Sequence, residues 1–108
     1  MSYSHRIADI QLADRLEAFG AVLIEGPKWC GKTTTAEQMS KSVIKMQDTE
    51  MQEEYAATAA SKPSLLLMGE TPRLIDEWQD APVLWDAVRT MVDKRQVPGQ
   101  FILTGSTV

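Results

Sequence analysis

The segment that most restricts how this chain can fold is the run GPKWCGKTTT at residues 26–35. It holds two glycines, a lysine and a threonine in the spacing G-x-x-x-x-G-K-[ST], at Gly26, Gly31, Lys32 and Thr33. A loop with this spacing binds phosphate groups when a strand leads into it and a helix follows it. The residues on either side of the run therefore decide how it is interpreted.

Both flanks have the required character. The preceding segment AVLIE, residues 21–25, is a continuous apolar run with β-branched members, which is typical of a strand buried on both faces of a parallel sheet. Residues 32–42 are good helix formers or hydroxyl residues at a helix start, with Ala36 and Met39 three apart on one face. The sequence therefore predicts a strand, a phosphate-binding loop and a helix.

The rest of the chain continues this alternation. A short helix is expected before Gly20, and Pro82 is expected in the first position of the last helix. Segment 64–73 fits either a helix end or an extended connection. The remaining strands are expected at 43–48, 73–79 and 100–106, and the remaining helices at 49–60 and from 82 through 94. This order predicts an α/β fold in which helices cover both faces of a mostly parallel sheet.

The composition is that of a single globular domain. Hydrophobic residues make up 44% of the 108 residues and charged residues 24%, which excludes a disordered chain. The longest apolar runs are too short to cross a bilayer, and the N-terminal segment lacks the apolar core of a secretory signal. We therefore expect a cytoplasmic protein.

Charge and cysteine content exclude several kinds of site. The net charge is −4 and no basic block is present, so the chain has no electrostatic footprint for nucleic acid. Cys30 is the only cysteine, so neither an intramolecular disulfide nor a thiolate zinc cluster can form.

The predicted loop would bind a nucleoside triphosphate through its backbone amides and the N-terminus of the following helix. Lys32 would reach the β- and γ-phosphates, and the Thr33 hydroxyl would bind Mg²⁺. Lys28 would either contact the γ-phosphate or be an exposed loop lysine. Trp29 would either cover the nucleotide or pack on its own domain. The residues expected to contact the nucleotide are Gly26, Pro27, Lys28, Trp29, Cys30, Gly31, Lys32, Thr33 and Thr34.

A second motif is LIDE, in which a strand ends in two carboxylates at Asp76 and Glu77. Asp76 would hold the water shell of Mg²⁺, and Glu77 would polarise a water for attack on the γ-phosphate. Acidic residues commonly end strands, so the motif alone is weak evidence. Its place downstream of a phosphate loop favours the catalytic interpretation.

A third motif is FILTGS at the end of the chain. Thr104, or failing that Ser106, ends a strand where open α/β sheets bind ligands. Thr104 would sense the γ-phosphate or orient the attacking water. The alternative is a hydroxyl that ends a strand in a turn.

Together these motifs resemble the AAA-type P-loop ATPases of a prokaryotic group that carries a domain of unknown function after the ATPase core. The resemblance rests on GAVLIEGPKWCGKTTTAEQ, PRLIDEWQDAPVLWDAVR and GQFILTGS, and it extends from about Arg6 to Ser106. It implies a three-layer α-β-α P-loop fold with strand order 5-1-4-3-2, in which the LIDE strand lies between neighbours of the phosphate-loop strand. It also implies ATP and Mg²⁺ as ligands and Glu77 as the catalytic carboxylate.

The resemblance also implies parts that follow the point where this chain stops, at Val108. Such ATPases continue with a fifth strand, a helical lid and the C-terminal domain. We therefore expect residues 1–20 to form a helix leading into the core, and residues 21–108 to form a core of about four strands without the fifth strand and the lid. This leaves the AVLIE strand at a sheet edge, so we expect self-association or a longer natural polypeptide.

The favoured function is ATP binding with Mg²⁺-dependent hydrolysis. A small-molecule kinase and a non-enzymatic module whose partner senses bound nucleotide remain alternatives. No arginine finger can be assigned, and Arg73, Arg89 and Arg95 are expected to be solvated surface charges.

Overall fold

The computed structural model describes residues 15–16, 18–26 and 32–106, without the side chains of residues 26, 32–34 and 106. Most of the helix expected over residues 1–20 lies outside the described residues. Within it, residues 15, 16 and 18 are helical, and the Phe19 N–H donates to the Arg15 carbonyl at 2.8 Å.

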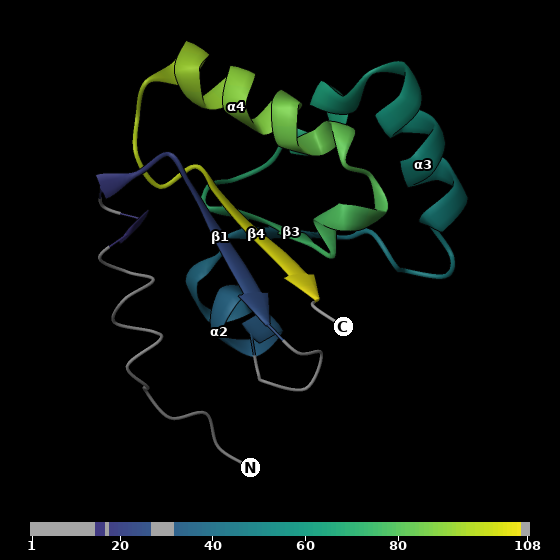
Figure 1. Cartoon of the computed structure of the whole chain (residues 1–108), viewed down its shortest axis with the longest axis horizontal. Helices are drawn as coiled ribbons and strands as arrows, with labels where there is room; N and C mark the ends of the chain where they lie inside the picture. The colour runs from purple at the N-terminus through teal and green to yellow at the C-terminus, as the bar shows by residue number, and fades with distance from the viewer. Residues whose placement is uncertain (1–14, 17, 27–31, 107–108) are drawn as a thin grey trace.

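The centre of the fold is a four-stranded sheet. Its strands are β1 (Ala21–Gly26), β2 (Ser42–Lys45), β3 (Arg73–Asp76) and β4 (Phe101–Ser106). They lie in the order β1-β4-β3-β2, and every neighbouring pair is parallel (Figure 1). The predicted α/β class with a parallel sheet is therefore confirmed, and β1 lies at one edge of the described sheet.

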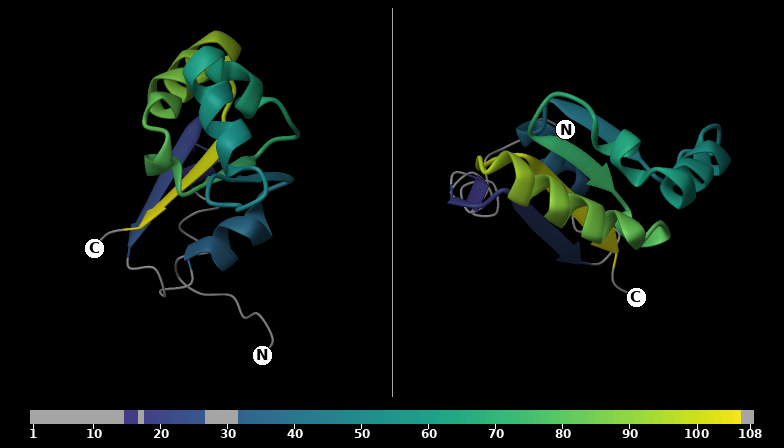
Figure 2. Two further views of the ribbon diagram at one scale, coloured as in Figure 1. Left: turned by 90° about the vertical axis from the view of Figure 1, so that its right-hand side faces the viewer. Right: turned by 90° about the horizontal axis from the view of Figure 1, so that it is seen from above.

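Helices cover both faces of the sheet and make three layers. Helix α2 (Lys32–Met39) lies on one face, while α3 (Gln52–Ser61) and α4 (Val83–Arg95) lie on the other (Figure 2). Two short 3₁₀ helices, η1 (Pro63–Leu67) and η2 (Trp78–Asp80), complete the described elements.

Two apolar clusters hold the layers together, one on each face of the sheet. On the α2 side, Ala36 packs with Val22, Leu74 and Ile102 from three strands, and Leu16 joins them. On the other side, alternate residues of the same strands pack under α3 and α4. This larger cluster contains Ile44, Met46, Ala59, Leu66, Leu67, Ile75, Ala81, Leu84, Val88, Phe101 and Leu103. Because both faces are covered, the middle residues of β1, β3 and β4 are apolar on both sides of the sheet.

Several element boundaries differ from the prediction. β2 ends at Lys45 rather than continuing to 48, because the chain turns at Met46 and Gln47. Helix α2 ends at Met39 instead of extending to residue 42. β3 ends at Asp76 because Glu77 adopts a left-handed conformation, with φ of 59°. Pro82 occupies the N-cap of α4, one position earlier than expected.

Among the described residues, no helix combines the length and apolar character needed to cross a membrane.

Candidate functional site

Three polar residues share one row across the carboxyl ends of the strands. Thr104 of β4 is in register with Asp76 of β3, and Asp76 is in register with Lys45 of β2. Side chains two residues earlier in β3 and β4, Leu74 and Ile102, pack on the α2 side. Because side chains in a strand repeat with a period of two, the polar row also faces the α2 side.

Thr104 bonds to both predicted acidic residues, to the carboxylate of Asp76 and to the backbone of Glu77. It is fully buried, and its Oγ1 donates a hydrogen bond to Asp76 Oδ1 at 2.6 Å. The same oxygen accepts a longer bond, 3.4 Å, from the backbone N–H of Glu77. The structure therefore brings together Asp76, Glu77 and Thr104, which are the candidates from the second and third motifs.

Glu77 is buried, with 6% of its surface exposed, and it turns the chain out of β3. Its φ and ψ of 59° and 52° lie in the left-handed region, which is uncommon for a residue with a Cβ atom. Such conformations cost on the order of 1 kcal/mol or more and tend to occur where a side chain must be aimed. The turn leads directly into η2.

Gln79 is a neighbour of this site that the sequence analysis did not identify. Its side-chain Nε2 donates a short hydrogen bond to Glu77 Oε2. A glutamine two residues after the strand-end glutamate was the available signal, but nothing in the sequence shows that the chain folds back between these positions.

Lys45 was also missed, because residues 43–48 were interpreted only as a strand. Its Nζ lies 2.9 Å from Glu37 Oε1 of α2. The hydrogen bond and charge of Glu37 raise the pKa of Lys45 above 10.5, with smaller contributions from the charges of Asp76 and Asp48. The lysine therefore joins α2 to the sheet beside the polar row and places a positive charge near Asp76.

The phosphate-loop segment connects to the same edge of the sheet. β1 ends at Gly26, in register with Ser106, and α2 begins at Lys32. The predicted contacts of Pro27, Lys28, Trp29, Cys30 and Gly31 lie outside the described residues, and so do those of the side chains of Lys32, Thr33, Thr34 and Ser106. The described residues therefore fix only the two ends of the predicted loop, Gly26 at the end of β1 and Lys32 at the start of α2.

The described oxygen atoms at this edge have the chemistry that Mg²⁺ prefers. This ion commonly uses one or two carboxylates together with phosphate oxygens and waters, not a full protein cage. Asp76 supplies a carboxylate at the strand end, oriented by the Thr104 hydroxyl. Within the described residues no group of three or more His, Cys, Asp or Glu side chains is arranged to hold a metal, and Mg²⁺ bound in this mode needs none.

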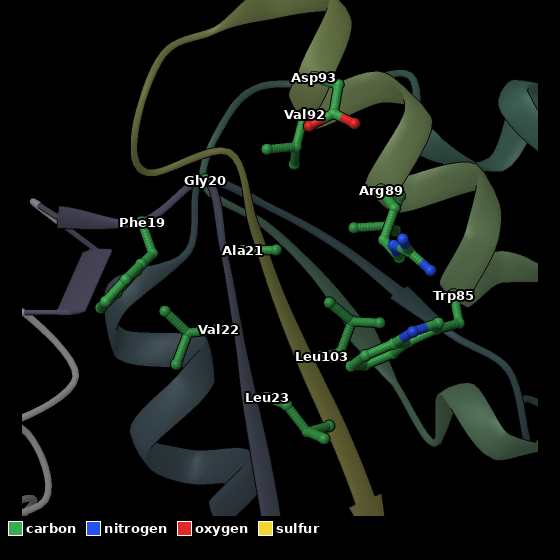
Figure 3. Close-up of a pocket in the computed structure, with 11 residues that line it drawn as sticks. Phe19, Gly20, Ala21, Val22, Leu23, Trp85, Arg89, Val92, Asp93 and Leu103 are labelled. Carbon is green, nitrogen blue, oxygen red and sulfur yellow. The ribbon is translucent and has the colours of Figure 1, made fainter.

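A separate apolar cavity of about 360 Å³ lies between β1 and α4 (Figure 3). Ala21, Leu23 and Leu103 of the sheet face Trp85 and Arg89 of α4 there. Asp76, Glu77 and Thr104 do not line it, so it is not part of the polar site.

Two of the three arginines differ from their prediction. Arg73 is not a solvated surface charge: its Nε donates to the Leu66 carbonyl at 2.8 Å and its Nη1 donates to Ser42 Oγ at 3.2 Å. Burial lowers the pKa of Arg73 below its usual value. Arg95 is half-buried, 5.7 Å from the Phe101 ring centre. Arg89 is a surface charge, as predicted, and pairs loosely with Asp86.

Comparison with known proteins gives two relatives and one matching family. Two relatives, the uncharacterized proteins Mb2031c of Mycobacterium bovis and Rv2008c of Mycobacterium tuberculosis, are each 32% identical over 107 residues. These alignments cover 98% of this chain but only 24% of each relative, so the chain spans about a quarter of their length. No solved structure matches significantly.

The sequence pattern of one family, described as an AAA domain, matches residues 18–108. The match contains the phosphate-loop segment and all four strands, together with the carboxylates at the end of β3. Such a domain has the nucleotide-binding, ATPase-like character that the motifs predicted. The chain therefore belongs to the AAA domain family of P-loop ATPase-like proteins.

Proposed function

We propose that this domain binds ATP together with Mg²⁺ and hydrolyses the terminal phosphate bond. The observation that carries the proposal is the convergence of Asp76, Glu77 and Thr104 at the carboxyl edge of the sheet. Ligands of open α/β sheets bind at this edge. The phosphate-loop segment connects to the same edge through the end of β1 and the start of α2.

Each group has a distinct role in the proposed reaction. Backbone amides of residues 26–33, the α2 N-terminus and the Lys32 ammonium group would neutralise the triphosphate. Asp76 and Thr33 would hold Mg²⁺, which when bound neutralises charge on the phosphate oxygens. Glu77 would accept the proton of the attacking water, and Thr104 would keep Asp76 oriented.

Binding is tested by titration calorimetry of folded protein with Mg·ATP and Mg·GTP. Lys32→Ala should abolish the heat of binding, because it removes the charge that contacts the phosphates. Lys41→Ala is the matched control, since it removes one exposed lysine just beyond α2. If the wild-type protein gives no heat with either nucleotide and Lys32→Ala changes nothing, the proposal is wrong.

Hydrolysis is tested with Glu77→Gln, which keeps the size of the side chain but removes the base. We expect this variant to bind ATP and to lose turnover by about two orders of magnitude or more. Turnover that requires an added acceptor would instead indicate a kinase. Tight binding without turnover in either protein would indicate a nucleotide-dependent interaction module.

A further inference from the structure

The loop that follows Glu77 places an amide group against its carboxylate. Gln79 lies in the middle of η2, and its Nε2 reaches back two residues to Glu77 Oε2. A carboxylate oxygen only accepts hydrogen bonds, so the amide must present its NH₂ group rather than its oxygen. A hydrogen bond to an ionised group is about twice as strong as a neutral one. Gln79 therefore restrains the direction in which the buried carboxylate points.

The Gln79 amide bonds to Glu77 through its nitrogen, while its oxygen makes no described hydrogen bond. Within the described part of the chain, Gln79 Oε1 and Trp78 Nε1 are buried and have no hydrogen-bond partner. An unsatisfied buried polar atom costs about 1–3 kcal/mol. Gln79 therefore uses its NH₂ group for the Glu77 contact, while its buried oxygen has no partner among the described residues.

Contacts on both sides fix the backbone of η2, and this limits the positions that the Gln79 side chain can adopt. The Ala81 N–H donates to the Trp78 carbonyl at 2.9 Å, and the Trp78 ring lies 5.2 Å from the Trp85 ring of α4. On the sheet side, η2 packs so closely on Gly105 that no side chain would fit there without a shift. A Cβ atom at this position would lie 3.0 Å from Trp78 Nε1 and 3.2 Å from Gln79 Oε1. η2 therefore packs between β4 and α4 and contacts both.

We propose that Gln79 is a positioning residue that holds the Glu77 carboxylate in the direction needed to receive a proton from the attacking water. The proposal rests on the proposed function, because it needs Glu77 to act as the base. Gln79 acts through Glu77 and need not touch the nucleotide. Its removal should therefore slow turnover and leave nucleotide binding intact.

The test compares steady-state ATP hydrolysis by the wild-type chain and by Gln79→Met, which has similar length but no amide. We expect kcat to fall roughly 10- to 100-fold, the scale of a misplaced catalytic group, while KM stays within about twofold. Gln79→Glu should lower kcat further, because it sets a second carboxylate against Glu77. Gln96→Met is the matched control: Gln96 is exposed and ends α4 just before β4 begins, at the opposite edge of the sheet from Glu77, so kcat should not change.

A double-mutant cycle separates positioning from general loss of structure. Residual hydrolysis of radiolabelled ATP under single-turnover conditions is measured in Glu77→Gln, with and without Gln79→Met. If Gln79 acts through Glu77, the second change should have little further effect. An equal further loss, or a loss of folding by both Gln79 variants seen by circular dichroism, would assign a structural role and overturn the inference.

The two proposals fail in different ways. Wild-type protein that binds no nucleotide or shows no turnover contradicts the proposed function, and the role of Gln79 is lost with it. Wild-type turnover with an unchanged or raised kcat in Gln79→Met overturns only the inference. A raised kcat would mean that the amide restrains Glu77 in a resting direction.

Discussion

Thr104 donates its hydroxyl proton to Asp76 across 2.6 Å while the same oxygen accepts the backbone N–H of Glu77. One buried hydroxyl thus bonds to both residues at the end of β3, Asp76 and Glu77. Thr104 is fully buried, so this hydrogen bond is shielded from solvent.

Replacing this hydroxyl should affect both stability and activity. Thr104→Val keeps the side-chain shape but leaves Asp76 Oδ1 and the Glu77 N–H without this partner, which should cost about 1–3 kcal/mol of unfolding free energy. Turnover should fall together with it, because Asp76 is no longer oriented. Thr104→Ser is the control, since it retains the hydroxyl and should keep most of the activity. Urea unfolding and ATP hydrolysis measure the two effects, and a fully active Thr104→Val would contradict this role.

Gly105 offers a way to displace Gln79 without removing any polar group. Gly105→Ala places a methyl group 3.0 Å from Trp78 Nε1 and 3.2 Å from Gln79 Oε1. The contacts are tight enough that η2 must shift by a few tenths of an ångström, which overpacking penalties put at about 1–3 kcal/mol. We expect kcat to fall with KM nearly unchanged. Unaltered kcat in a folded Gly105→Ala protein would show that the position of η2 does not matter for turnover.

The sequence predicted the elements whose pattern is local, and it missed contacts that depend on how distant segments meet. The strands around Leu23 and Leu103 were identifiable because burial on both faces requires continuous apolar runs. Asp76 and Glu77 were identifiable because they end such a run. The contact from Gln79 to Glu77 was not, since it depends on a left-handed turn and on the space left by Gly105.

Arg73 shows the same limit for a charged residue. Arginine is mostly exposed in folded proteins, and Arg73 was expected on the surface for this reason. In the fold, β3 is an inner strand, and η1 folds back so that the Leu66 carbonyl accepts from the guanidinium group. The route of residues 64–73 was the one connection that the sequence left open, and this route decides the burial of Arg73.

The ion pair between Lys45 and Glu37 should give a stability contribution that depends on pH. The folded-state pKa of Lys45 is raised above 10.5, so the contribution is fully present below pH 10.5 and is lost as pH rises through the folded-state value. The side chains are 53% and 38% exposed, so the size should be only about 0.2–1 kcal/mol. Thermal unfolding of wild type and Lys45→Met should differ slightly at pH 8, and the difference should disappear as pH rises through the folded-state pKa of Lys45. A difference that grows with pH would contradict the assignment.

Gln96, like Glu77, has a left-handed backbone conformation, and glycine should be more stable than glutamine at this position. Gln96 ends α4 with φ of 55°, and its N–H donates to the Val92 carbonyl. Its side chain is exposed. Gln96→Gly should therefore stabilise the fold by about 0.5–1 kcal/mol, because glycine adopts this conformation without strain. Gln96→Ala should not. Urea unfolding measures both, and equal stability of the two variants would show that the helix end relaxes instead.

The edge strand β1 gives the last prediction. Among the described strands, β1 pairs only with β4, so no described strand pairs with the backbone groups on its other side. Beside it lies the apolar cavity under α4, with Phe19 at its margin. An apolar edge of this kind pairs readily with a strand from another chain. We therefore expect the chain to self-associate as its concentration rises.

Light scattering across a wide concentration range measures this association. Phe19→Glu should weaken it by placing a charge beside the edge. Leu65→Glu is the matched control, because Leu65 is 56% exposed and Phe19 60%, but Leu65 lies on η1, which is not part of the edge. A stable monomer at high concentration, or equal effects of the two variants, would rule out pairing through β1. Association lost only in Phe19→Glu would show that the molecules associate through the β1 edge.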